Sequence, residues 1–207
     1  MKKNTLIALA TVAALAVGCA AMRAEDDTAI RALTMMKASF KERGQAKLDR
    51  LNQDETQRLC SVHATDKQLP KDVAARIEKA NLENIKYPSD GKLMGDWKNG
   101  ERIAQSGVGK QFSDGPEAAS GGNCYACHQL SKAELAFGTI GPSLHNFDKL
   151  RGFTPEMQKY AYGKIYNSQA FSACSTMPRF GHQQILTEKQ IQDLVALLMD
   201  PQSPVNQ

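Results

Sequence analysis

The stretch Asn123–His128, with the sequence NCYACH, places two thiols three residues apart and a histidine directly after the second. This Cys-x-x-Cys-His spacing is typical of covalent c-type haem attachment. Each thiol can add across one vinyl group of the haem, and the adjacent imidazole then meets one face of the iron. The motif therefore predicts one covalently bound haem c, attached through Cys124 and Cys127, with His128 as an axial ligand.

Three other interpretations of this motif are weaker. A zinc site needs about four nitrogen or sulfur ligands, and the sequence has no second Cys-x-x-Cys and no His-x-x-x-His. A thioredoxin-like redox pair usually follows a strand, and no alternating strand pattern precedes Cys124. A disulfide across two intervening residues has poor geometry and leaves His128 without a role.

A low-spin electron carrier holds its iron from both faces, so a second ligand must come from farther along the chain. The candidates are Met157, Met177, Met199, His145 and His182. Met177 is favoured because it lies in a non-helical stretch, Cys174–Phe180, with proline directly after it. Proline fixes the backbone and removes a donor, so such a loop can hold a thioether rigidly. His/Met ligation favours a higher reduction potential than His/His ligation.

The turn at Gly141–Leu144 follows the second haem cysteine by fourteen residues. A backbone carbonyl in this position can accept the Nδ1–H of His128 and fix the ring and its tautomer. Pro142 is the predicted acceptor. Lys149, Arg151 and Arg179 are candidates to meet the haem propionates, although solvated surface charge is the more ordinary role for each.

Two further cysteines, Cys60 and Cys174, lie beyond the N-terminal segment. In an exported protein two leftover thiols usually pair, so we predict a Cys60–Cys174 disulfide that ties the N-terminal part of the chain to the Met177 loop. The alternative is that Cys174 is a free reactive thiol near the haem, which would require a lowered pKa and access.

The first 24 residues have the pattern of a secretory signal: a short basic start, an apolar run and small residues up to Ala24. Ala16–Cys19 also resembles a lipoprotein box, with Ala where Leu is usual, so lipidation of Cys19 after cleavage is an alternative. Either process places the protein in the periplasm, with a lipid anchor in the second case. The formal charge of +4 falls when this basic segment leaves, and nothing indicates nucleic acid as a partner.

Residues 25–87 are polar and carry narrow helical apolar stripes, with Asp54 as a possible cap and Pro70 opening a later helix. They predict a helical extension that packs on the next domain or on a partner, and a partly disordered leader over 25–48 is the alternative. The turn at Tyr87–Gly91 marks a boundary. Residues 88–207 then form one small domain.

Helical signals dominate residues 88–207. A first helix is expected over about 96–106, where Gly100 suggests a close helix crossing because glycine costs a helix about 1 kcal/mol. A second helix starts at Thr154 with Pro155 in its first position. The last helix starts at Thr187, with Gln190 at capping-box spacing, and ends at Asp200-Pro201. The sequence therefore predicts an all-α fold.

Together the motifs resemble SoxX, the monohaem subunit of the SoxAX cytochrome of bacterial sulfur oxidation. The resemblance covers Leu51 through Gln207 and rests on five stretches: Gly122–His128, Gly138–Leu144, Lys164–Asn167, Met177–Gly181 and Asp200–Asn206. It implies the class I cytochrome c fold with the first and last helices crossing, and His128 and Met177 as the two axial ligands.

The same resemblance implies a role and partners. The chain would be the electron-transfer subunit of a complex with SoxA, a cytochrome subunit with one or two haems, and the complex would attach thiosulfate to a cysteine of the carrier protein SoxYZ. The thiosulfate chemistry would belong to SoxA, so no catalytic residue is expected here. The haem would accept electrons from SoxA and pass them to a downstream c-type cytochrome. The alternatives are a free soluble electron carrier and, from another class, a haem enzyme such as a peroxidase with an open iron position.

Overall fold

The computed structural model describes residues 28–66 and 68–207. The predicted signal segment 1–24, with Cys19, lies outside the described residues. The chain forms two compact units that meet in sequence between Asn52 and Gln53. The sequence-based boundary at residue 88 falls inside the second unit.

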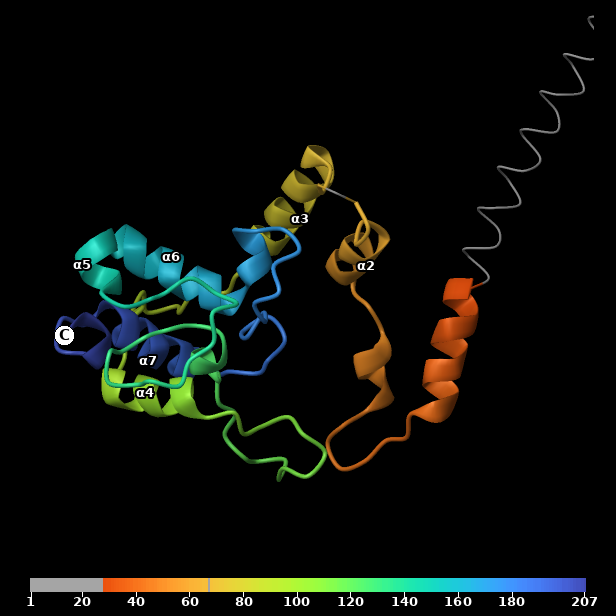
Figure 1. Ribbon diagram of the computed structural model, residues 1–207, viewed down its shortest axis with the longest axis horizontal. Helices are drawn as coiled ribbons and strands as arrows, with labels where there is room; N and C mark the ends of the chain where they lie inside the picture. The colour runs from red at the N-terminus through yellow and green to blue at the C-terminus, as the bar shows by residue number, and fades with distance from the viewer. Residues whose placement is uncertain (1–27, 67) are drawn as a thin grey trace, which may run out of the picture. The chain divides into compact units, whose positions relative to one another are not determined.

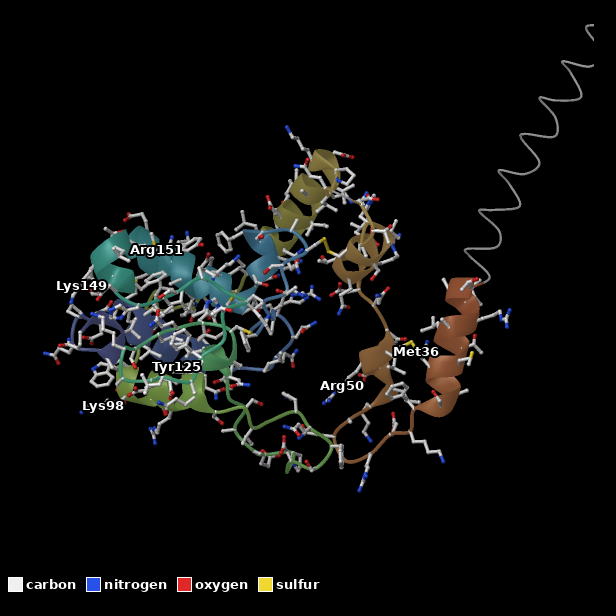
Figure 2. The ribbon with its side chains drawn as sticks, in the orientation of Figure 1. Met36, Arg50, Lys98, Tyr125, Lys149 and Arg151 are labelled. Carbon is white, nitrogen blue, oxygen red and sulfur yellow. A yellow bond between two sulfur atoms is a disulfide. The ribbon has the colours of Figure 1, made fainter. Side chains whose placement is uncertain are left out.

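The first unit, as far as it is described, contains a helix over residues 28–39 and the 3-10 helix η1 (Leu48–Leu51). An isolated bridge joins Arg43 and Ala46 between them. The helix side chains are exposed, as Figure 2 shows for Met36. Part of the stretch for which disorder was the alternative is therefore helical.

The second unit is built from helices and loops, and no strand occurs in the described residues. Its α-helices are α2 (Glu55–Val62), α3 (Lys71–Glu83), α4 (Trp97–Gln105), α5 (Phe147–Arg151), α6 (Pro155–Tyr166) and α7 (Glu188–Met199). Its 3-10 helices are η2 (Cys124–Ala126), η3 (Ser168–Ala170) and η4 (Pro204–Asn206). None of the described helices has the length and hydrophobicity of a membrane-spanning segment.

The helix starts follow the capping signals of the sequence. Asp54 and Thr187 each close a capping box, with Gln57 and Gln190 respectively. Thr154 caps α6 by accepting a hydrogen bond from the amide of Met157, ahead of Pro155. These capping signals, predicted from sequence, are confirmed. Each cap satisfies amides that the first helical turn would otherwise leave without a hydrogen-bond partner.

Helix α7 is the centre of the fold, and it packs against α4 on one side and α6 on another (Figure 1). Its residues from Leu194 to Met199 are all buried. All of them except Ala196 belong to one hydrophobic core with Ile103 of α4 and Ile165 of α6. The loop that contains η2 starts at the end of α4. The core that holds α4 in place therefore also positions the start of the loop with the Cys-x-x-Cys-His motif.

The crossing of α4 and α7 depends on Gly100. A Cβ atom at this position would lie 2.1 Å from the carbonyl oxygen of Asp193 and 3.0 Å from the Cβ of Leu197. The Asp193 carboxylate, fully buried, accepts hydrogen bonds from the Asp96 amide at 2.8 Å and from Asn99 Nδ2 at 2.5 Å. Backbone contact and a carboxylate thus join the two helices, and the close crossing predicted from Gly100 is confirmed.

We predict that Gly100→Ala destabilises the protein by about 2 kcal/mol, because the added methyl group must push the α4 backbone away from α7. The sign is informative, since Ala is favoured over Gly in an unobstructed helix by about 1 kcal/mol. Urea unfolding of the haem-loaded protein measures the change. The control is Gly115→Ala, where a Cβ would meet nothing within 4 Å. Equal midpoints for Gly100→Ala and wild type would contradict the packing described here.

Candidate functional site

The Cys-x-x-Cys-His motif forms a tight turn. Asn123 adopts the left-handed conformation, with φ of 46°, and starts η2. The carbonyl of Cys124 then accepts hydrogen bonds from the amides of Cys127, at 3.1 Å, and His128, at 2.9 Å. This turn brings the two thiols and the imidazole together within five residues. Cys124 and Cys127 are half-buried and are not bonded to each other.

Burial raises the pKa of the Cys124 thiol to about 12. A redox-active Cys-x-x-Cys pair needs the opposite shift, because the thiolate is the reactive form. The zinc interpretation also lacks support, since the described residues contain no group of three His, Cys, Asp or Glu side chains that could hold a metal ion.

The imidazole of His128 is held by the loop that follows the motif. Its Nδ1 lies 2.7 Å from the carbonyl oxygen of Pro142. A carbonyl can only accept, so Nδ1 carries the proton and donates it, which leaves the lone pair of Nε2 free to bind a metal. The structure thus places Pro142 against the ring nitrogen that the sequence analysis assigns to it.

Two glycines allow the loop to lie this close. The amides of Gly138 and Gly141 donate to the carbonyls of Tyr125 and Cys127, both at 2.8 Å. A Cβ at Gly141 would lie 2.1 Å from the His128 ring, and one at Gly138 would lie 1.9 Å from the Ala126 carbonyl oxygen. The loop therefore covers η2 by backbone contact, and larger residues at these two positions would displace the imidazole.

Met177 lies in a loop whose backbone is fixed on both sides of this residue. Its amide donates to Ser175 Oγ at 3.2 Å, and its carbonyl accepts from Ser168 Oγ at 2.5 Å. Its side chain is half-buried and packs against the hydrophobic core. Two hydroxyl groups from different segments thus hold the residue in one backbone position, as a rigid thioether ligand would require.

The competing ligand candidates have other surroundings. Met199 is fully buried in α7 as part of the core, and Met157 lies half-buried in the first turn of α6. His182 is half-buried, and burial together with the charge of Arg179 lowers its pKa. His145 is also half-buried, and neither ring nitrogen has a hydrogen-bond partner within residues 28–66 and 68–207.

The candidate propionate contacts divide into two kinds. Lys149 and Arg151 are exposed on α5, where Figure 2 labels them. Arg179 is only 5% exposed, and its Nη2 donates to Asp54 Oδ2 at 2.5 Å. Solvated surface charge is therefore the wrong interpretation for Arg179, because its guanidinium is buried and pairs with the carboxylate of Asp54, the N-cap residue of α2, whose side chain is 41% exposed.

The Met177 loop is also bonded covalently to helix α2. Cys60 of α2 and Cys174 form a disulfide, with Cα atoms 5.4 Å apart, visible as the yellow sulfur–sulfur bond in Figure 2. Cys174 has a φ of 57°, which is uncommon for a residue with a side chain. The free-thiol alternative for Cys174 does not describe this structure.

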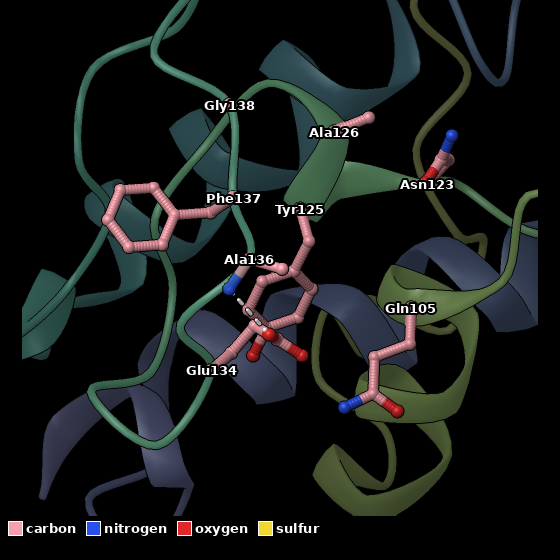
Figure 3. Close-up of a pocket in the computed structure, with 8 residues that line it drawn as sticks. All are labelled: Gln105, Asn123, Tyr125, Ala126, Glu134, Ala136, Phe137 and Gly138. Carbon is pink, nitrogen blue, oxygen red and sulfur yellow. Dashed lines mark hydrogen bonds between the residues drawn. The ribbon is translucent and has the colours of Figure 1, made fainter.

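An open pocket of about 490 Å³ lies next to the motif (Figure 3). Tyr125 and Glu134 line it, and the Tyr125 hydroxyl donates to Ser131 Oγ at 3.4 Å. Neither haem cysteine nor His128 is among its lining residues. The pocket is therefore not formed by the two thiols and the imidazole of the motif.

Comparison with known proteins agrees with this site. A family model described as Cytochrome c matches residues 109–200, which include the motif, Pro142 and Met177. An uncharacterized lipoprotein of Aquifex aeolicus (strain VF5) is 41% identical over 155 residues, covering 74% of this chain and 73% of that protein. Residues 109–200 are therefore a cytochrome c domain, and the protein is a c-type cytochrome.

This c-type cytochrome has the class I cytochrome c fold, and the all-α prediction is confirmed. Its role is haem-based electron transfer, and its haem c is bound covalently. The residues present fit that group. Two unpaired thiols stand beside an imidazole whose Nε2 is left free.

Some residues that shape the site were not assigned this role from the sequence, and they differ in whether the sequence near them could have indicated it. Ser168 lies nine positions before Met177, and its contact with the Met177 carbonyl exists only because η3 turns the chain back. Gly141 could have been singled out, since it precedes Pro142 and a backbone approach to the ring requires a residue without a side chain. Asp54 gave a capping signal, whereas its second partner, Arg179, is 125 residues away.

We predict that replacing Cys124 and Cys127 together by Ala abolishes covalent haem, because no sulfur remains to bond the vinyl groups. Acid–acetone extraction followed by a haem stain of the denatured polypeptide measures the bond. The control is the Cys60→Ser, Cys174→Ser variant, which also lacks two sulfurs and should keep its haem. Acid-resistant haem on the Cys124, Cys127 variant would contradict the assignment.

Proposed function

We propose that this cytochrome carries one haem, with iron held between His128 Nε2 and the thioether of Met177. The observation that carries the proposal is the hydrogen bond from His128 Nδ1 to the Pro142 carbonyl, because it leaves only Nε2 as a ligand. The haem supplies an iron that cycles between two oxidation states. The chain contributes the two axial ligands, and a thioether ligand favours a higher reduction potential than a second imidazole.

Met177→Ala should leave the haem covalently attached but open one axial position. We expect a high-spin ferric spectrum, loss of the near-infrared charge-transfer band of thioether-ligated iron, and tight binding of added imidazole. Met157→Ala is the matched control, since it removes a half-buried methionine from α6. An unchanged spectrum in Met177→Ala would exclude Met177 as a ligand.

We further propose that the cytochrome is the electron-transfer subunit of a SoxAX-type complex that joins thiosulfate to a cysteine of a SoxYZ-type carrier. The support is the resemblance over Leu51–Gln207. In this role it accepts electrons from a SoxA-type haem and passes them to another c-type cytochrome. The helices α2 and α3, bonded to the Met177 loop, add surface that a solitary carrier does not require.

The proposed location is outside the cytoplasm, with a lipid anchor at Cys19. The pattern of the first 24 residues supports export, and Ala16–Cys19 resembles a lipoprotein box. The name of the Aquifex relative, a lipoprotein, agrees with the anchor. Export also agrees with the cofactor, because bacteria attach c-type haem outside the cytoplasm.

Purification of the native protein from its source tests the assembly. A SoxAX-type subunit should co-elute with a second haem protein, and thiosulfate with the carrier protein should reduce its haem. Elution as a lone species of about 20 kDa, with a haem that thiosulfate and carrier leave oxidised, would contradict the proposal and favour a free electron carrier.

A further inference from the structure

The segment from Asn167 to Arg179, which contains Met177, is bonded to α2 and α3 at several points. Two of these are contacts with α3: the Asn167 side chain donates to Asn81 Oδ1 at 2.9 Å, and the Ala173 amide donates to Glu78 Oε1 at 3.1 Å. The others are the Cys60–Cys174 disulfide and the Arg179–Asp54 ion pair, both with α2 or its cap. This segment therefore contacts α2 and α3 both through residues that precede Met177 and through a residue that follows it.

The ion pair is the contact that follows Met177 in the chain. Asp54 is suited to couple the position of α2 to that of the loop. One carboxylate oxygen, Oδ1, accepts the Gln57 amide at 2.9 Å and so fixes the start of α2. The other, Oδ2, accepts from Arg179 Nη2 at 2.5 Å. Burial alone would raise the pKa of Asp54, but the Gln57 amide and Arg179 together hold that pKa below its usual range. Asp54 thus stays charged and joins α2 to the loop.

Arg179 cannot easily leave this position. Its side chain is 5% exposed, and an unpaired guanidinium beneath the surface is costly. The next residue, Phe180, is buried in the core, and the carbonyl of Arg179 accepts from the Gln183 amide at 2.9 Å. Met177 is only two residues before Arg179, so a shift of the guanidinium changes the path of the backbone that carries the thioether.

We propose that Asp54 and Arg179 are positioning residues for Met177: their ion pair holds the loop so that the thioether stays on the iron. The helical region before the cytochrome domain thereby sets how readily the sixth ligand is lost. This inference rests on the proposed ligation by Met177. The pair acts through the backbone of residues 177–179, not by touching the haem.

The test compares Asp54→Asn with Glu55→Gln in the full-length, haem-loaded protein. Asn is as good an N-cap as Asp, so α2 keeps its start while the charge that pairs with Arg179 is removed. Glu55 is the matched control, because it is adjacent and its ion pairs with Arg58 and Arg76 are exposed. Imidazole titration of the ferric protein measures displacement of the thioether, with the near-infrared thioether band and the reduction potential as further readouts.

We expect Asp54→Asn to raise the apparent affinity for imidazole by about tenfold, because a hydrogen bond to a charged group is lost, with a lower reduction potential; Glu55→Gln should match wild type. Arg179→Met is a second variant that should have the same effect. Asp54→Asn should add little in its presence, since the two residues act as one unit. If Arg179→Met does not accumulate, Asp54→Asn decides.

An affinity and a potential equal to wild type in Asp54→Asn would overturn the inference, as would an equal change in Glu55→Gln. The wild-type protein separates this failure from that of the ligation itself. If wild type lacks the thioether band and binds imidazole as readily as Met177→Ala, the proposed ligation is wrong. If the band is present and unaltered in wild type and in Asp54→Asn, only the positioning role is wrong.

Discussion

The hydrogen bond from His128 Nδ1 to the Pro142 carbonyl is the interaction on which the haem site depends. The thiols of Cys124 and Cys127 determine where a porphyrin is attached, but they do not orient the imidazole. The bond, 2.7 Å long, does so, and it exists only because Gly138 and Gly141 let the loop lie directly on η2. One backbone carbonyl thus determines which nitrogen is free and which way the ring is turned.

The loop that contains Met177, the proposed second ligand, is held by more distant parts of the chain. Helices α4 and α7 form the frame, joined by contact at Gly100 and by the buried carboxylate of Asp193. The Met177 loop leaves this frame and is held by hydroxyl groups, by a disulfide and by the ion pair with Asp54. Because an exposed loop is otherwise mobile, these contacts explain how the backbone at Met177 is kept in one place.

Local rules predicted a large part of this architecture. The caps at Asp54, Thr154 and Thr187 were correct because a capping residue acts on amides within three positions. The role of Gly100 followed from the cost of glycine in a helix. Helix α5 was not predicted, since it has only five residues, too few to give a periodic pattern, and its N-cap residue Asn146, with φ of 58°, makes no side-chain cap that a sequence signal could announce.

What sequence could not provide were contacts between distant segments. Arg179 reads as a surface charge, and only the return of the chain past α2 buries it against Asp54, 125 residues away. The boundary at Tyr87–Gly91 is a sound turn signal, yet α2 and α3 belong to the same compact unit as the cytochrome domain. Part of the attachment of α2 and α3 is polar and covalent, and the spacing of apolar residues does not reveal such contacts.

The central claim is that iron is held between an imidazole and a thioether in this chain. The iron K-edge X-ray absorption spectrum of the oxidised full-length protein tests this claim most directly. The account predicts a single sulfur neighbour beside a shell of nitrogen neighbours. A spectrum that requires only nitrogen or oxygen neighbours would contradict it.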